Sequence, residues 1–185
     1  MTSKTYEEKI SKYDWSKLLK LWSLIQEGTT NTEGWDAGKA LEYLIVRAFE
    51  LELGKENVTY PFDVDLSSIV DNRKSIEQID GVVYVNGISF ILECKDYNDS
   101  LDVESIAKIR NQLLRRPSGT IGCVFSTSGF TAPAIILAHF TAPQTILLWE
   151  KEDIDFAFKK RSFAHVLQRK YRYFVEKGIP NFKIS

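Results

Sequence analysis

Sulfur-containing and imidazole side chains are scarce in this chain, which has two cysteines, one methionine and two histidines among 185 residues. Both cysteines, Cys94 and Cys123, lie within apolar, strand-like runs. Cysteines in such runs behave as small core side chains, so we expect reduced thiols and a cytoplasmic protein rather than a disulfide. The histidines, His139 and His165, have no partners at the spacing of zinc ligands, which argues against a zinc site.

Long hydrophobic runs are also missing. No apolar stretch approaches the roughly 20 residues that a helix needs to cross a bilayer, and residues 1–10 have no signal-peptide pattern, so we expect no membrane partner. No internal repeat, low-complexity tract or linker-like stretch divides the chain. Its length therefore predicts a single domain over 1–185. Within it we expect a helical extension over 1–36, a core over 37–150 and a basic helical segment over 151–185.

Acidic and basic residues nearly balance over the whole chain, with a net charge of −1, but they are unevenly distributed. Residues 159–185 contain eight basic side chains and one acidic side chain, which leaves a charge of about +7 there and about −8 elsewhere. A basic segment interleaved with aromatic residues suits a polyanionic partner, although a solvated helix face has the same composition. The acidity of the remainder argues against very tight non-specific DNA binding.

Hydrophobic periodicity predicts helices near the N-terminus. Residues 6–26 have apolar side chains at helical spacing, and a second helix is expected over 37–53, before Gly54. Residues 57–64 predict a strand, which Pro61 places near a sheet edge.

The rest of the chain alternates between strand and helix patterns. In chain order we expect a loop over 66–77, strands over 79–84 and 88–95, a helix from Asp102 to Arg116, a strand over 120–126, a helix over 131–139, a strand over 145–149, and helices from Asp153 and over 163–176. Strands joined through helices favour parallel pairing, whereas a hairpin adds an antiparallel part. The sequence therefore predicts an α/β fold with a mixed central β-sheet flanked by helices.

Two carboxylates and an amine are expected to meet at the end of the hairpin. Asn86-Gly87 is a strong two-residue hairpin signal, and folding the chain there brings Asp80 toward Glu93. Because alternate side chains of a strand share a face, Glu93 and Lys95 lie on one face and Cys94 on the other.

This trio suits a divalent metal held beside a phosphodiester. Mg²⁺ prefers carboxylate and carbonyl oxygens, which Asp80, Glu93 and the backbone carbonyl of Cys94 provide. Lys95 would orient or deprotonate a water molecule, or hold the phosphate. A Glu-x-Lys pair on a strand is more often solvated or ion-paired across strands. Here it ends an apolar strand, where unpaired charges are expensive.

The chain resembles the Mrr-like branch of the PD-(D/E)XK nuclease superfamily. The resemblance rests on Gly38, Leu41-Glu42, Phe49, Ile79-Asp80-Gly81, Leu92-Glu93-Cys94-Lys95, Gln112, Phe125-Ser126-Thr127-Ser128-Gly129-Phe130-Thr131 and Ala134. It implies a restriction-endonuclease-like fold, with 37–150 as the catalytic core and Asp80, Glu93 and Lys95 as its metal-dependent active site. It also implies that Glu42 faces the metal and that Gln112 lies near the phosphate. Ile79 stands where the name of the superfamily expects proline, a departure that is frequent in such nucleases.

These observations predict an endonuclease that depends on Mg²⁺ (or Mn²⁺) and hydrolyses phosphodiester bonds of DNA, in restriction, defence or repair. One alternative is a binding module on the same fold that cuts weakly or not at all. Another is a subunit of a larger nuclease assembly, and cutting both strands would favour a homodimer.

Residues 126–131 suit a structural turn or, less favourably, a phosphate site. The arginines of the helix after Asp102 suit DNA contacts or salt bridges equally, and they are Arg110, Arg115 and Arg116.

Overall fold

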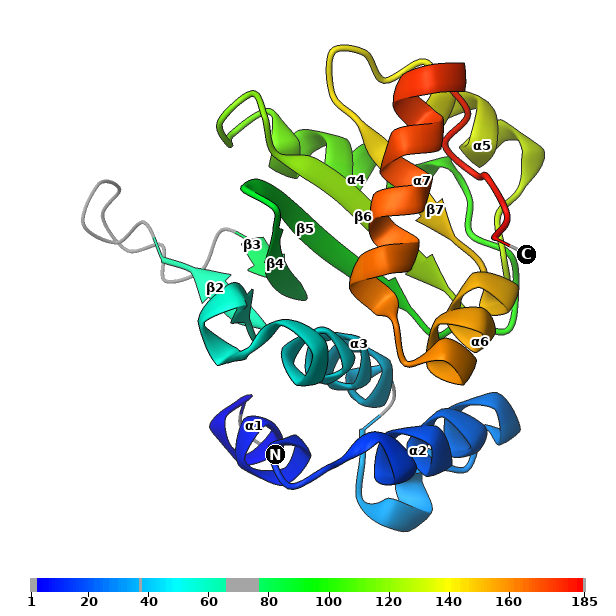
Figure 1. Ribbon diagram of the computed structural model, residues 1–185. Helices are drawn as coiled ribbons and strands as arrows, with labels where there is room; N and C mark the ends of the chain where they lie inside the picture. Colours follow the sequence, from blue (N-terminus) through cyan, green and yellow to red (C-terminus); the bar gives the residue numbers. More distant parts are fainter. Residues whose placement is uncertain (1–2, 37, 66–76, 185) are drawn as a thin grey trace.

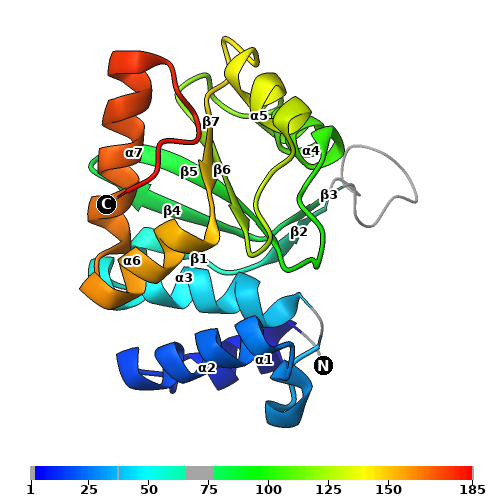
Figure 2. The ribbon, with the colours of Figure 1, turned by 90° about the vertical axis from the view of Figure 1, so that its right-hand side faces the viewer.

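The computed structural model describes residues 3–36, 38–65 and 77–184, so Ala37 and most of the loop expected over 66–77 lie outside the described residues. A five-stranded sheet runs through the molecule, with helices on both of its faces (Figures 1 and 2). The described strands are β1 (Val58–Thr59), β2 (Phe62–Val64), β3 (Glu77–Ile79), β4 (Gly81–Val85), β5 (Ile88–Lys95), β6 (Ile121–Ser126) and β7 (Ile146–Trp149). The described α-helices are α1 (Ser3–Ile10), α2 (Trp15–Glu27), α3 (Lys39–Leu53), α4 (Val103–Leu113), α5 (Ala132–His139), α6 (Lys151–Lys160) and α7 (Phe163–Lys177).

The sheet is mixed, which confirms the predicted α/β class. Its strand order is β1-β4-β5-β6-β7, and the β1–β4 and β4–β5 pairs are antiparallel whereas the β5–β6 and β6–β7 pairs are parallel. The hairpin turns where it was predicted, since Asn86 and Gly87 both have positive φ angles, of 52° and 78°. A separate two-stranded antiparallel sheet pairs β2 with β3.

Helices on the two faces enclose separate parts of the core. On one face α4 and α5 cover a cluster that includes Ile91 and Val124, and on the other α3 and α7 cover a larger cluster that includes Leu92 and Phe125. The α1 and α2 helices form an outer layer beyond α3 (Figure 1). Cys94 and Cys123 are buried free thiols in the larger cluster, as predicted.

Three predicted elements are interrupted in the structure. The helix expected over 6–26 is two helices, because Asp14 caps the second by accepting a hydrogen bond from the Lys17 N–H. The strand expected over 57–64 is split between β1 and β2 at Pro61, which has no N–H to continue a ladder. The strand expected over 79–84 is broken at Asp80, between β3 and β4.

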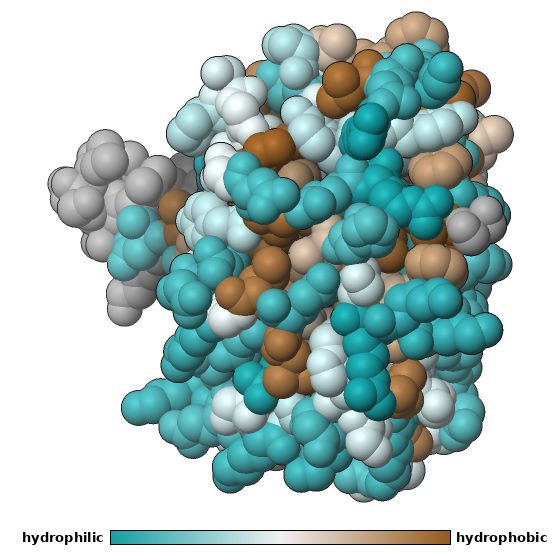
Figure 3. All heavy atoms as spheres, viewed as in Figure 1, coloured by the Kyte–Doolittle hydropathy of each residue, from teal (hydrophilic) through white to brown (hydrophobic). Residues whose placement is uncertain are grey.

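The face of the molecule drawn in Figure 3 is mostly hydrophilic, with hydrophobic side chains scattered among polar ones. Within the described parts of the chain, no helix combines the length and apolarity that spanning a membrane requires.

A buried ion pair fastens the C-terminal segment to the edge strand β7. Lys170, 1% exposed, binds Asp153 Oδ2 at 2.8 Å and also donates to the Leu148 carbonyl at 2.9 Å. Asp153 accepts a further hydrogen bond from the Ile184 N–H at 2.9 Å, and the Leu148 N–H donates to the Pro180 carbonyl at 2.9 Å. The last residues therefore cover the free edge of β7, which would otherwise present unpaired backbone groups.

Replacing Lys170 with methionine should lower the free energy of unfolding by about 3 kcal/mol, because Asp153 would remain buried without its cation. Urea denaturation followed by circular dichroism would measure this, with Lys159→Met on the exposed surface of α6 as the control. Equal stability of the two variants would contradict the assignment of Lys170 as an anchor.

Candidate active site

Glu93 lies at the end of the central strand β5 and is bound by two lysines. Its side chain is fully buried, and Oε1 lies 2.5 Å from Lys95 Nζ. Lys108 of α4 donates to both carboxylate oxygens, at 2.6 and 2.9 Å. Glu93 and Lys95 share the face of β5 that carries Ile91, as the alternation of strand side chains predicted.

Asp80 stands beside Glu93 because of the way the hairpin is registered. Gly81 pairs with Leu92, so Asp80 is one residue beyond the last β4–β5 pair, opposite Glu93. Its Oδ2 accepts the Cys94 N–H at 2.8 Å, and this side-chain acceptor takes the place of a backbone partner where the strand breaks. Asp80 is 3% exposed.

Gly81 allows α3 to pack closely against the start of β4. A Cβ added there would lie 2.6 Å from Val46 Cγ2 and 3.3 Å from the Thr59 carbonyl oxygen. Any larger residue would push α3 outward, and α3 carries Glu42. Asp80 therefore belongs to the site itself, and Gly81 permits the close packing of α3 that brings Glu42 to it.

Glu42 enters the site from α3, and it is also bound by a lysine. Lys39, one helical turn earlier, donates to both of its carboxylate oxygens, at 2.9 and 2.7 Å. Glu42 is buried, its charge acts on Asp80, and the charges of Lys95 and Glu93 act on Glu42. The structure thus brings together four of the residues singled out from the sequence, namely Glu42, Asp80, Glu93 and Lys95.

Burial and neighbouring carboxylates raise the pKa values of Asp80 and Glu42. Burial, followed by the charges of Glu93 and Glu42, raises the pKa of Asp80 to about 7. Burial also raises the pKa of Glu42, against the opposing effect of Lys39. For Lys95, burial acts to lower the pKa, but the charges of Glu93 and Asp80 outweigh it and raise the pKa above its usual value. Lys95 is therefore a protonated ammonium group in this structure.

The donor set fits a hard divalent cation by its chemistry. Three buried carboxylates supply oxygen ligands, and Asp80 has no ion-pair partner among the described residues, so a cation would relieve the repulsion that raises its pKa. In the described part of the chain, however, no three His, Cys, Asp or Glu side chains are grouped so that they would hold a metal as they stand. Lysines bind Glu42 and Glu93 instead. The Cys94 carbonyl as a metal ligand stays a prediction.

Gln112 contacts the strand before Asp80. Its Nε2 donates to the Gln78 carbonyl at 3.1 Å, and its Oε1 is buried without a hydrogen-bond partner among the described residues. Two arginines of the following turn, Arg115 and Arg116, bind Glu77 of β3. The salt-bridge interpretation therefore holds for these two arginines, which fasten α4 to β3.

Two site residues, Lys108 and Lys39, were not found from the sequence. Lys108 lies four residues before Gln112 on α4, so the spacing that places Gln112 on the inner side of the helix places Lys108 there too. Lys39 lies three residues before Glu42, a spacing at which opposite charges meet on a helix. Helical periodicity applied to the predicted site residues would have indicated both lysines.

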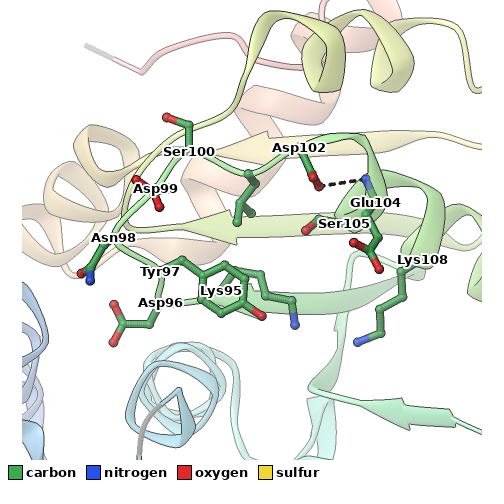
Figure 4. Close-up of a pocket in the computed structure, with 11 residues that line it drawn as sticks. Lys95, Asp96, Tyr97, Asn98, Asp99, Ser100, Asp102, Glu104, Ser105 and Lys108 are labelled. Atoms are coloured by element: carbon green, nitrogen blue, oxygen red, sulfur yellow. Dashed lines mark hydrogen bonds between the residues drawn. The ribbon is translucent and has the colours of Figure 1, made fainter.

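A hollow of about 750 Å³ opens beside Lys95 (Figure 4). It is lined by residues 95–102 together with Glu104, Ser105 and Lys108, and is called here the 95–108 hollow.

Residues 126–131, for which a structural turn or a phosphate site was expected, contact the loop that lines this hollow. Ser126 Oγ donates to the Gly129 carbonyl at 3.0 Å, and Thr131 caps α5, so the contacts favour the structural turn.

Fold and site together define an α/β protein with a mixed sheet, in which carboxylates and a lysine cluster at the end of a central strand. The family model described as restriction endonuclease (Mrr_cat) matches residues 37–156. The chain belongs to this family, which confirms the resemblance found in its sequence.

A solved structure, that of the DNA modification-dependent restriction endonuclease AspBHI, is similar to this chain with a TM-score of 0.47 and 13% sequence identity. The similarity covers 87% of this chain and 40% of that one, so the chain spans less than half the length of this neighbour. Comparison with curated protein sequences returns no match.

Proposed function

We propose that this protein is a DNA endonuclease that requires Mg²⁺ or Mn²⁺ and hydrolyses phosphodiester bonds. The observation that carries the proposal is the convergence of three buried carboxylates, from Glu42, Asp80 and Glu93, with the ammonium group of Lys95 at the end of a central strand. Buried acids are expensive unless they are paired or bind a cation, and Asp80 has no ion-pair partner among the described residues, so its burial beside Glu42 and Glu93 calls for a function. Membership in the restriction endonuclease family supports the same conclusion.

The side chains divide the work of the reaction between them. Asp80, Glu93 and Glu42 would hold the cation, which supplies Lewis-acid charge and a coordinated water of lowered pKa when bound. Lys95, whose ammonium group is bound to Glu93, would hold the scissile phosphate and stabilise its added negative charge, or orient the attacking water. Gln112 positions the strand that leads into Asp80.

The setting that this function suits is restriction of foreign DNA, another defence role, or DNA repair. One active site per chain cuts one strand at a time, so cutting both strands would call for two copies.

A second candidate function is DNA binding with little or no cutting, and a specific observation favours it. Both oxygens of Glu93 are already bound by lysines, Lys95 and Lys108, so a cation would have to compete with them for this carboxylate. The basic C-terminal segment gives this candidate less support than its composition suggested. Three of its cations are ion-paired within the protein, namely Lys170, Arg172 and Lys183.

A plasmid assay separates the two functions. Supercoiled DNA incubated with the protein should be nicked or linearised in Mg²⁺ or Mn²⁺ and left intact in EDTA. The Lys95→Ala variant should cut more slowly than the natural chain by a factor of at least about 10². A variant of matched charge change on the surface, Lys159→Ala, serves as the control. DNA that is shifted in a gel but never cut, at any divalent concentration, would favour the binding module and contradict the endonuclease.

A further inference from the structure

The 95–108 hollow joins directly onto the proposed active site. Lys95 and Lys108, the two lysines that bind Glu93, also line the hollow, and in Figure 4 their ammonium groups lie on the same side of it. Its volume of about 750 Å³ falls within the range of roughly 300–1,000 Å³ that holds small organic ligands. A group bound in the hollow would therefore be a close neighbour of the phosphate held by Lys95.

The wall of the hollow is a well-fastened loop. The Leu101 N–H donates to the Gly129 carbonyl and the Thr131 N–H donates to the Leu101 carbonyl, both at 2.9 Å. Ser128 Oγ donates to the Asp99 carbonyl at 2.6 Å, and Thr127 Oγ1 donates to Asp96 Oδ1 at 3.0 Å. The turn over residues 127–131 thus holds the loop at several points, so the hollow is formed before any ligand arrives.

The charge of the hollow disfavours a phosphate within it. Acidic side chains outnumber lysines around it, with Asp96, Asp99, Asp102 and Glu104 against Lys95 and Lys108. The carboxylates of Asp99 and Glu104 form no hydrogen bond or ion pair with other residues in the described parts of the chain. Such acceptors repel phosphate oxygens but suit the amino groups of nucleobases.

Tyr97 provides the hollow with an aromatic surface. Its side chain is 56% exposed, and Lys95 Nζ lies 6.0 Å from the ring centroid. Figure 4 shows the ring beside the Lys95 side chain. An aromatic ring that is open to solvent beside a phosphate-binding lysine is the arrangement on which a nucleobase stacks.

We propose that the 95–108 hollow binds one nucleobase of the strand being cut, stacked on Tyr97 next to the scissile phosphate. The inference rests on the proposed nuclease function. It adds Tyr97 as the residue that positions the DNA strand in the active site. An unpaired base fits a hollow of this size and charge, so the site favours single-stranded, frayed or unstacked DNA over an undisturbed duplex.

The inference is testable by binding alone, without cutting. Short single-stranded oligonucleotides that each carry one 2-aminopurine would be titrated with the full chain in EDTA, where the fluorescence of the reporter falls on stacking. We expect one reporter position to be quenched, with Tyr97→Ala weakening binding about tenfold and losing the quenching. Tyr97→Phe keeps the ring and should bind within about twofold of the natural chain.

Phe140→Ala is the matched control. Phe140 is 74% exposed and follows the last residue of α5, about 12 Å along that helix from the end that contacts the hollow. Oligonucleotide binding that is unchanged by Tyr97→Ala would overturn the base site and leave the nuclease proposal standing. Equal losses in Tyr97→Phe and Tyr97→Ala would also overturn it. A chain that binds no oligonucleotide would likewise overturn the base site, and plasmid cutting in Mg²⁺ would still decide the nuclease proposal.

Discussion

Replacing Glu93 with glutamine should slow phosphodiester cleavage by about 10³-fold or more while the protein stays folded. The change removes one negative charge from the centre of the carboxylate cluster and keeps the shape of the side chain. Glu93 is the residue on which Lys95 and Lys108 both converge, so its loss weakens cation binding and also releases the lysine that would hold the phosphate. Both effects act on the same chemical step.

The measurement is the rate of plasmid nicking in Mg²⁺ under single-turnover conditions, with the melting temperature recorded for each variant. Glu152→Gln, which removes the same charge from the exposed first turn of α6, is the control and should cut at the natural rate. Cleavage by Glu93→Gln within tenfold of the natural chain would exclude the cluster as the active site.

The parts of the site that could be predicted from the sequence are those whose geometry is set by residues close together in the chain. The meeting of Asp80, Glu93 and Lys95 follows from two local rules, the turn preference of Asn86-Gly87 and the alternation of side chains along a strand. Glu42 was indicated only by family resemblance, because its position depends on how α3 packs over Gly81. No local pattern carries that information.

The fold shows the same division. The mixed sheet and most helices were predicted, because hydrophobic periods and caps such as Asp102 and Thr131 are local signals. The break at Pro61 follows from its missing N–H and could have been read from the sequence, whereas the break at Asp80 depends on which strand pairs with which. The predicted strands ran through both of them. The 95–108 hollow also escaped prediction, since its wall is held by a turn over residues 127–131 that is distant in sequence.

Replacing Asp80 with asparagine should stabilise the metal-free protein at pH 8 and change its stability little at pH 4. The pKa of Asp80 is raised from 3.8 to about 7 by burial and by Glu93 and Glu42. A raised pKa means that the folded state holds the proton more tightly than the unfolded state. The stability linked to this group is fully present below pH 4 and is lost as the pH rises through about 7.

Asparagine carries no charge at either pH, so it avoids this loss and keeps an oxygen that accepts the Cys94 N–H. We expect a gain of about 2–4 kcal/mol at pH 8 in EDTA, measured by urea denaturation across the pH range. Asp63→Asn on the exposed strand β2 is the control and should show no such pH-dependent gain. Added Mg²⁺ should reverse the order at pH 8 by stabilising the natural chain alone, because a cation that binds only the folded state raises its stability. If Asp80→Asn gave no gain at pH 8, the carboxylates would not repel one another as the structure indicates, and the case for a cation between them would lose its physical basis.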